Sequence, residues 1–191
     1  QLLEKINNKY LLTHGNIQNT LFAIHVAKKM KINNKTILSA LNSFKGLPHR
    51  QQKIFINKKF QVINDSKSTS FESSLAALKS YTNIYWILGG LPKFRDKLDL
   101  KFVRQNLKKA YIVGKNTKFF ANQLKNKIDF KISYTISKAT NYILEDIKNN
   151  DKFATILFSP SGASFDQFKN FENRGKFFQK IILKKLKKRD D

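Results

Sequence analysis

Four short polar segments, each directly after an apolar run, carry the side chains in this sequence that could do chemistry. Lysine and hydroxyl donors, together with free N–H groups where a helix begins, favour anions such as carboxylates and phosphates. Because the same residue types also cap helices and form tight turns, each segment taken alone is more simply structural. The segments are residues 65–70 (DSKSTS), 89–93 (GGLPK), 114–115 (GK) and 159–164 (SPSGAS).

Several other chemistries lack the residues that they need. The absence of cysteine excludes disulfides, thiolate zinc sites and cysteine nucleophiles, and His14, His25 and His49 have no metal-ligand spacing, so no metal site is expected. The sequence has no Gly-x-x-x-x-Gly-Lys-Ser/Thr loop, no Gly-x-Gly-x-x-Gly and no nucleophile elbow. A complete ATP site or a serine hydrolase triad is therefore not expected within these residues alone, and an ATP site would have to be shared with another part of the protein.

The elements that must position these segments follow Pro48, where β-branched runs alternate with amphipathic stretches. This alternation predicts an α/β fold with a Rossmann-like, mostly parallel sheet and helices on both faces. Ligands of such sheets bind beyond the carboxyl ends of the strands, so the four segments should share one edge. The expected strands are 53–57 and 60–64, which form a hairpin, then 84–90, 110–114, 130–136 and 153–160; the expected helices are 70–81, 98–107, 116–126, 137–150 and 166–188.

The first 47 residues have a different pattern. Apolar residues recur at helical spacing over 17–30 and 34–44, and Gly46 and Pro48 end the second helix. Two helices without a sheet can hardly bury both of their faces, so we interpret residues 1–47 as the tail of a domain whose body lies upstream. No run approaches the 18 apolar residues of a membrane span, and a cytoplasmic monomer without membrane insertion is expected.

The net charge of the chain suggests an alternative function. The 37 Lys+Arg against 13 Asp+Glu give a formal net charge of +24, which taken alone points to a polyanion and hence to a basic nucleic-acid-binding module. However, the basic residues are mostly lysines spread along the whole chain, and no RNP-like, zinc-finger or helix-turn-helix signature is present. Nucleic acid is therefore the less favoured partner, and a solvated lysine-rich surface explains the charge equally well.

Five motifs follow one another along the chain. They are the pair Asn16 and Asn19, residues 46–50 (GLPHR), residues 64–69 (NDSKST), the pair Gly89-Gly90 followed by Lys93, and Ser159-Pro160 followed by 163–175 (ASFDQFKNFENRG). In order and spacing these motifs resemble those of the Mur ligases that add D-glutamate to UDP-N-acetylmuramoyl-L-alanine. The resemblance covers essentially the whole chain, and its last motif is long and particular to this branch of the ligases.

This resemblance implies two domains and a reaction. Residues 1–47 would be the tail of the central ATPase domain, and residues 48–191 the C-terminal domain that brings in the amino acid. In the family, ATP phosphorylates the L-alanine carboxylate of UDP-N-acetylmuramoyl-L-alanine, and the amine of D-glutamate attacks the acyl phosphate. The resemblance implies ATP and Mg²⁺ as cofactors, held mostly by upstream parts, so that this chain alone should be inactive.

The resemblance also assigns residues by motif. Asn16, Asn19, Arg50 and Asp65 would bind ATP, the first pair near adenine and Asp65 at the ribose hydroxyls. Lys67, Thr69, Lys93, Ser164 and the backbone of Phe171 would bind D-glutamate, and none of the nine residues is a covalent catalyst. Two positions depart from the family pattern: Gly15 stands where a histidine usually precedes the first asparagine, with His14 displaced by one, and Ser161-Gly162 replaces Ala-Cys.

Three hypotheses follow. A part of a D-glutamate ligase in peptidoglycan precursor synthesis explains the polar segments together. A nucleic-acid-binding module explains only the charge and predicts steeply salt-dependent binding. An unrelated Rossmann-like enzyme would need a site of its own, and the sequence offers none.

Overall fold

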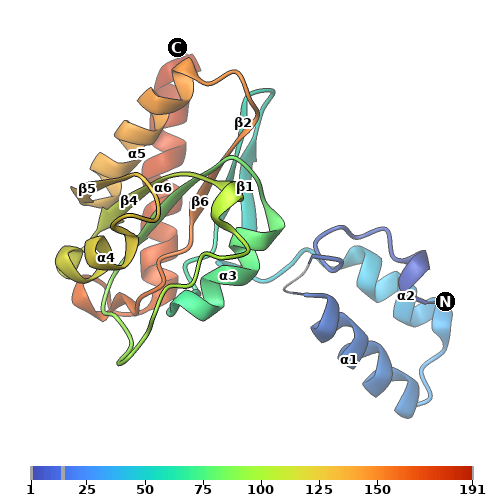
Figure 1. Cartoon of the computed structure of the whole chain (residues 1–191). Coiled ribbons are helices and arrows are strands. Elements are labelled where there is room, and N and C mark those ends of the chain that lie inside the picture. Colours follow the sequence, from blue (N-terminus) through green and yellow to red (C-terminus); the bar gives the residue numbers. More distant parts are fainter. Residues whose placement is uncertain (1, 14–15, 191) are drawn as a thin grey trace. The chain divides into compact units, whose positions relative to one another are not determined.

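The computed structural model describes residues 2–13 and 16–190 and divides into two compact units, Gln1–Leu47 and Pro48–Asp191 (Figure 1). His14 and Gly15, the positions at which the chain departs from the adenine-side motif, lie outside the described residues.

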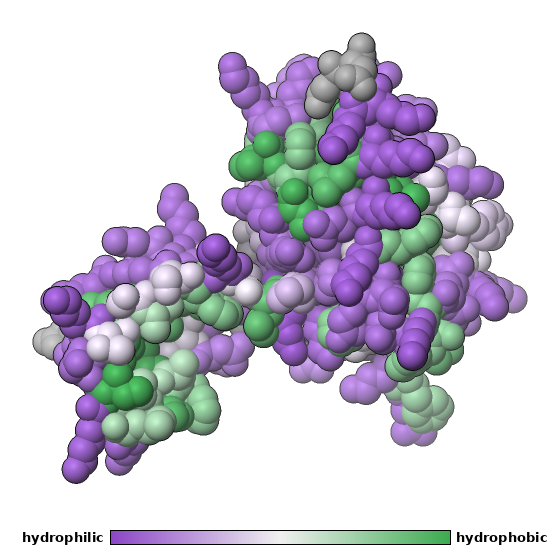
Figure 2. All heavy atoms as spheres, turned by 180° about the vertical axis from the view of Figure 1, so that it is seen from behind, coloured by the Kyte–Doolittle hydropathy of each residue, from purple (hydrophilic) through white to green (hydrophobic). Residues whose placement is uncertain are grey.

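The first unit, the helical unit, contains helices α1 (Ile17–Lys29) and α2 (Asn34–Ser43), as the apolar spacing predicts. Asn33 caps α2 by accepting a hydrogen bond from the backbone N–H of Thr36 at 2.9 Å. The core of the helical unit is small, and several of its apolar side chains remain exposed. Figure 2 shows them as green patches among purple ones. The buried apolar residues are Ile6, Leu11, Ile24 and Ile37, and the exposed ones on α1 and its C-cap are Leu21, Phe22, Val26 and Met30.

The second unit, the α/β unit, is built on one six-stranded sheet in the order β1-β2-β6-β3-β4-β5. The edge strand β1 pairs antiparallel with β2, as the predicted hairpin requires, and every other neighbouring pair is parallel. This sheet confirms the predicted α/β fold class. The strands are β1 (Gln52–Ile56), β2 (Phe60–Asn64), β3 (Ile84–Gly89), β4 (Leu107–Val113), β5 (Phe130–Tyr134) and β6 (Ala154–Phe158).

Helices cover both faces of the sheet (Figure 1). Helices α5 (Ile136–Asp146) and α6 (Phe171–Asp190) pack on one face, where Phe178 stacks on Phe158 of the central strand at 4.4 Å between ring centroids. Helices α3 (Phe71–Ser80) and α4 (Thr117–Leu124) pack on the other face. Because both faces are covered, β3 and β6 are buried throughout, and their residues are apolar except for Thr155 in β6.

The chain order brings three polar segments together. The connections β2-α3-β3 and β4-α4-β5 run along one face, whereas α5 returns the chain on the opposite face, so that β6 inserts between β2 and β3. The chain after β6 continues into α6, on the face opposite to α3. The carboxyl ends of β2, β6 and β3 therefore form the topological switch point, where α/β sheets bind ligands.

One predicted helix is wrong and one begins later than expected. Residues 98–107 contain only a short 3-10 turn, Arg104–Asn106, because Leu98, Leu100 and Val103 do not share one helical face but are all buried against the sheet. The last helix begins at Phe171 instead of 166, after a 3-10 turn at Ser164–Asp166.

Candidate functional site

The site is built from the loops that follow β2, β6, β3 and β4, which hydrogen bonds tie to one another. Leu91 and Ala163 exchange two backbone hydrogen bonds of 2.8 Å between the β3 and β6 loops. The amide of Ser161 donates to the carbonyl of Ser68 at 3.1 Å and so joins the β6 and β2 loops. The amide of Lys115 donates to Asp166 at 3.2 Å. The four segments singled out in the sequence therefore form one continuous edge.

The residues expected to bind D-glutamate come from three of these loops and from the start of α6. The Lys67 ammonium lies 4.1 Å from the centre of the Phe171 ring, at the positive end of the α6 dipole. Thr69 and Lys93 are exposed on the β2 and β3 loops, whereas Ser164 on the β6 loop is only 2% exposed. The Lys67 ammonium beside a helix N-terminus suits an anion, and the exposed Thr69 and Lys93 add a hydroxyl and an ammonium group on the linked loops.

Arg50 and Asp65, expected on the ATP side, also lie near each other. His49 and Gln51, on either side of Arg50, both have left-handed backbone angles, with φ of 62° and 45°, which are rare for residues other than glycine. The amide of Gln51 donates to Asp65 Oδ1 at 3.0 Å, and this bond fixes the turn that carries the exposed Arg50 side chain. The Arg50 charge is among the influences that lower the pKa of Asp65.

The Asp65 carboxylate is buried among hydroxyls. Ser68 and Ser159 donate to its Oδ2 at 2.6 and 2.8 Å, and the hydroxyls of Ser159, Ser74 and Ser161 continue as a chain with spacings of 2.8 and 2.6 Å. Burial raises the pKa of Asp65 to about 6, although the hydrogen bonds from Ser68, Ser159 and Gln51 and the Arg50 charge oppose it. An ionised carboxylate has about four acceptor positions, and the bonds from Ser68, Ser159 and Gln51 occupy three of them.

Asn16 and Asn19 belong to the helical unit, whereas the other seven candidate residues belong to the α/β unit. Asn16 precedes α1, and its Nδ2 donates to the Tyr10 carbonyl at 2.9 Å. Asn19 is exposed on α1.

A buried polar layer, which the sequence did not predict, lies beneath the loops. Asn64 Nδ2 lies 3.0 Å from both His49 Nδ1 and the Gly175 carbonyl, and burial lowers the pKa of His49. Gly175 is required here, because a Cβ at this position would lie 2.3 Å from His49 Nδ1. Arg174 is also buried and contacts two of the loops. In the sequence, Arg174 could have been singled out by its position in the first turn of a predicted helix. The helix dipole disfavours a cation there unless carbonyl groups surround it.

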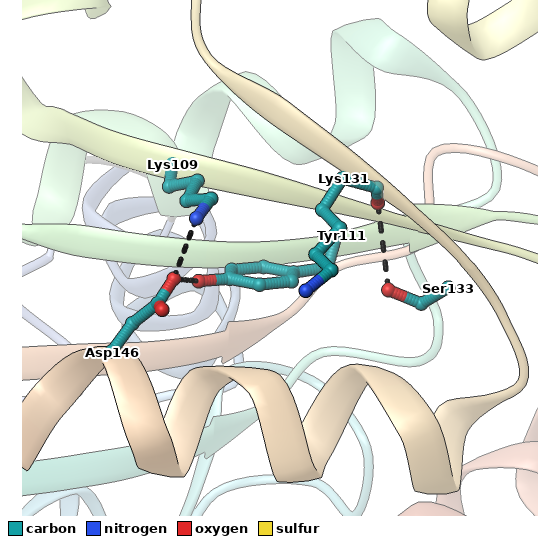
Figure 3. Close-up of polar contacts among 5 residues, drawn as sticks. All are labelled: Lys109, Tyr111, Lys131, Ser133 and Asp146. Carbon is teal, nitrogen blue, oxygen red and sulfur yellow. Dashed lines mark hydrogen bonds and ion pairs between the residues drawn. The ribbon is translucent and has the colours of Figure 1, made fainter.

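A second polar cluster lies away from this edge, around Asp146 at the end of α5 (Figure 3). Its Oδ2 accepts hydrogen bonds from Lys109 Nζ at 2.7 Å and from the Tyr111 hydroxyl at 2.5 Å. The positive charge of Lys131 also helps to lower the pKa of Asp146. The Lys131 ammonium itself lies over the Tyr142 ring, 3.4 Å from its centre. This cluster holds the end of α5 against β4.

Within residues 2–13 and 16–190, no group of three or more His, Asp or Glu side chains is arranged to hold a metal ion. In the same described stretches, no helix combines the length and apolar character that crossing a membrane requires.

Comparison with curated proteins gives matches to UDP-N-acetylmuramoylalanine–D-glutamate ligases. That of Rickettsia conorii is 38% identical over 175 residues, covering 91% of this chain and 35% of that protein. The ligase of Prochlorococcus marinus is 38% identical over 177 residues, covering 90% and 38%. The chain thus spans less than two fifths of the length of these relatives. No protein-family model matches the chain.

Two solved structures share the fold. A UDP-N-acetylmuramate–alanine ligase from Thermotoga maritima aligns with 92% of this chain and 38% of its own, with a TM-score of 0.65. MurF from Acinetobacter baumannii aligns with 88% of this chain and 37% of its own, with a TM-score of 0.56. Because both are only 14% identical to this chain, the likeness is one of fold alone.

Proposed function

Because the chain belongs to the family of the D-glutamate-adding Mur ligases, we propose that it forms the C-terminal part of an ATP-dependent ligase. The complete protein would join D-glutamate to UDP-N-acetylmuramoyl-L-alanine in peptidoglycan precursor synthesis. The observation that carries this proposal is the convergence of the β2, β3 and β6 loops and the start of α6 at one switch point. Since the chain spans less than two fifths of the length of its relatives, the activity is proposed for the complete protein that contains this chain.

D-Glutamate brings two carboxylates and an amine, and the candidate donors suit both carboxylates. Lys93 and Thr69 would hold one carboxylate, and Ser164 with the Phe171 amide would hold the other, with Lys67 as a helper. The closeness of Lys67 to the Phe171 ring supports this grouping, because it adds a cation at the helix N-terminus. Hydrogen bonds between charged partners are the strong ones, so these contacts would fix the amine in a single orientation.

ATP would be held on the other side of the switch point. Arg50 would contact the ribose or a phosphate, and Asp65 would accept a hydrogen bond from a ribose hydroxyl. Asn16 and Asn19 would contact the adenine. Support comes from the short link between Arg50 and Asp65, since Gln51, directly after Arg50, donates its amide to that carboxylate. The phosphates and Mg²⁺ would be held mainly by the part of the protein that corresponds to the rest of its relatives.

The reaction needs positioning more than a covalent catalyst. The D-glutamate nitrogen, as the free amine, would attack the acyl phosphate carbon and the C–N bond would form. The C–O bond to phosphate would then break as phosphate leaves, and the nitrogen would release one proton to solvent. Holding the amine and the acyl phosphate in line makes the step effectively unimolecular. Fixed cations and amides at the switch point would stabilise the developing negative charge.

The two units would then have separate roles. The helical unit would be the tail of the central ATPase domain, and the α/β unit would be the amino-acid-binding domain. The exposed apolar side chains of α1, with Phe22 at 72% and Met30 at 68% exposure, support further packing of the helical unit in the complete protein. The cytoplasmic location and the monomeric state expected from the sequence remain predictions.

The test is an assay of ATP hydrolysis by the complete protein that contains this chain, with UDP-N-acetylmuramoyl-L-alanine present. Phosphate release that requires D-glutamate, with L-glutamate as the matched control, is the expected result. Phosphate release that is independent of the amino acid, or that prefers L-glutamate, would overturn the proposal.

A further inference from the structure

Arg174, in the first turn of α6, is the residue that joins the loops beneath the candidate site. It is only 3% exposed. Its Nε donates to the Ser66 hydroxyl at 3.1 Å, and one Nη donates to the Ser66 carbonyl at 2.8 Å. The other Nη donates to the Gly162 carbonyl at 2.8 Å. One planar group therefore fixes the β2 loop relative to the β6 loop.

The β3 loop also closes over this guanidinium. A Cβ at Gly90 would lie 3.0 Å from Arg174 Nη1 and 2.5 Å from the Ala163 carbonyl oxygen, so only glycine leaves the room that Arg174 occupies. Three loops of the candidate site thus meet at a single side chain.

The Ser66 hydroxyl extends this contact to the start of α6. It accepts from Arg174 Nε and donates to the Phe171 carbonyl at 2.9 Å. The residue whose amide we assign to a D-glutamate carboxylate is therefore held through Ser66 by the same guanidinium.

Among the described residues, Arg174 has no carboxylate within salt-bridge distance. Carbonyl and hydroxyl oxygens surround the guanidinium. Burial lowers the pKa of Arg174 to about 10, and the more distant Asp166 opposes this change. A buried charge without a partner is costly, and an anion bound above the loops would offset that cost.

We propose that Arg174 is a positioning residue for the amino acid: it fixes the spacing of the β2 and β6 loops, and its buried positive charge favours a carboxylate bound above them. This inference rests on the proposed function, because the carboxylate is that of D-glutamate. Arg174 does not touch the ligand; it acts through Ser66, Gly162 and the loops that they belong to. Through these loops, Arg174 sets the positions of Lys93 and Ser164 relative to each other.

Two substitutions of Arg174 separate the effect of its hydrogen bonds from the effect of its charge. Both are measured in the complete protein that contains this chain. Arg174→Lys keeps the charge but cannot make the three hydrogen bonds, and Arg174→Gln also loses the charge. We expect the KM for D-glutamate to rise about tenfold in Arg174→Lys and further in Arg174→Gln. The KM for ATP should change less than about threefold in both.

A purely structural role gives a different result. Loss of folded protein lowers kcat and the melting temperature but leaves the KM for D-glutamate unchanged, and that outcome would overturn the proposal. Arg104→Lys is the matched control, because Arg104 also donates its Nε to a carbonyl, that of Lys127, but on an exposed part of the α/β unit away from the site.

A milder variant keeps the test decisive if both Arg174 variants fail to fold. Ser66→Ala removes the Nε contact and the bond to the Phe171 carbonyl but leaves the backbone contacts, so the KM for D-glutamate should rise about threefold to tenfold. An unchanged KM in Ser66→Ala would contradict the proposal. A wild-type protein without D-glutamate-dependent activity would instead contradict the proposed function, so the two failures are distinguishable.

Discussion

Two buried or half-buried carboxylates of the α/β unit are held in opposite ways. Asp146 shares one oxygen between the Lys109 ammonium and the Tyr111 hydroxyl (Figure 3), whereas Asp65 is surrounded by serine hydroxyls and a backbone amide. Burial opposes ionisation of Asp146, but its hydrogen bonds and the nearby lysine charges outweigh burial and lower its pKa. Burial dominates at Asp65 and raises its pKa to about 6.

The difference separates a structural contact from a candidate binding site. A carboxylate that is paired with a cation stabilises the fold and has little left to offer a ligand. A carboxylate that is held mainly by neutral hydroxyls at a switch point has no paired cation, which costs stability and is typical of a functional site. Four predictions test this contrast, and they are ordered here by the size of the expected effect.

The largest effect should come from the charge of Asp65. Its pKa is raised on folding from 3.8 to about 6, so the fold binds the proton more tightly, and stability is lost as pH rises between these values. Asp65→Asn removes this dependence. The free energy of unfolding of the variant relative to wild type should therefore increase by about 3 kcal/mol between pH 3.5 and pH 7.

Urea unfolding of the 191-residue chain, followed by circular dichroism across this pH range, measures the difference. A constant difference between Asp65→Asn and wild type would show that the Asp65 carboxylate is not destabilised by burial.

The next effect should be on catalysis. Lys93→Ala and Ser164→Ala each remove a charge-assisted hydrogen bond to D-glutamate, so kcat/KM for D-glutamate should fall about a hundredfold in the complete protein. The melting temperature should change little for Lys93→Ala, because Lys93 is exposed. Lys97→Ala, another exposed lysine of the same loop, is the matched control and should retain wild-type kinetics. Unchanged kinetics in both site variants would remove the assignment.

A smaller effect should follow from breaking the serine chain that holds Asp65. Ser74→Ala leaves the hydroxyls of Ser159 and Ser161 with one partner fewer inside the protein, so the free energy of unfolding should fall by about 1–2 kcal/mol. Ser80→Ala is the control on the same helix, because the Ser80 hydroxyl bonds only to the Ala76 carbonyl one turn back. Equal losses in the two variants, measured by urea unfolding, would mean that the chain contributes nothing beyond a single local bond.

The smallest effect should be at Asp146. Because the pKa of Asp146 is lowered on folding, its contribution is present above pH 3.8 and is lost as pH falls below that value. The Asp146 side chain is 34% exposed, so Asp146→Asn should cost less than about 1 kcal/mol at pH 7. The KM for D-glutamate should be unchanged, and an altered KM would show that this cluster also serves the site.

Much of this architecture could be predicted from the sequence, because its signals are local. The alternation of apolar runs with amphipathic stretches predicts the sheet, and the polar residues after the runs predict the shared edge. The helix predicted over 98–107 does not form, because Leu98 and Leu100 are both buried in the core and this tertiary packing outweighs the local spacing of apolar residues. The roles of Arg174 and Asn64 could not be predicted, since Ser66, a partner of Arg174, is 108 residues away in the sequence and Gly175, a partner of Asn64, is 111 residues away.

The most direct test of the central claim is a crystal structure of the complete protein that contains this chain with D-glutamate bound. We predict that one ligand carboxylate lies about 3 Å from Lys93 Nζ and the other about 3 Å from Ser164 Oγ and the Phe171 amide. D-Glutamate bound elsewhere, with these three groups out of hydrogen-bond range, would contradict the account.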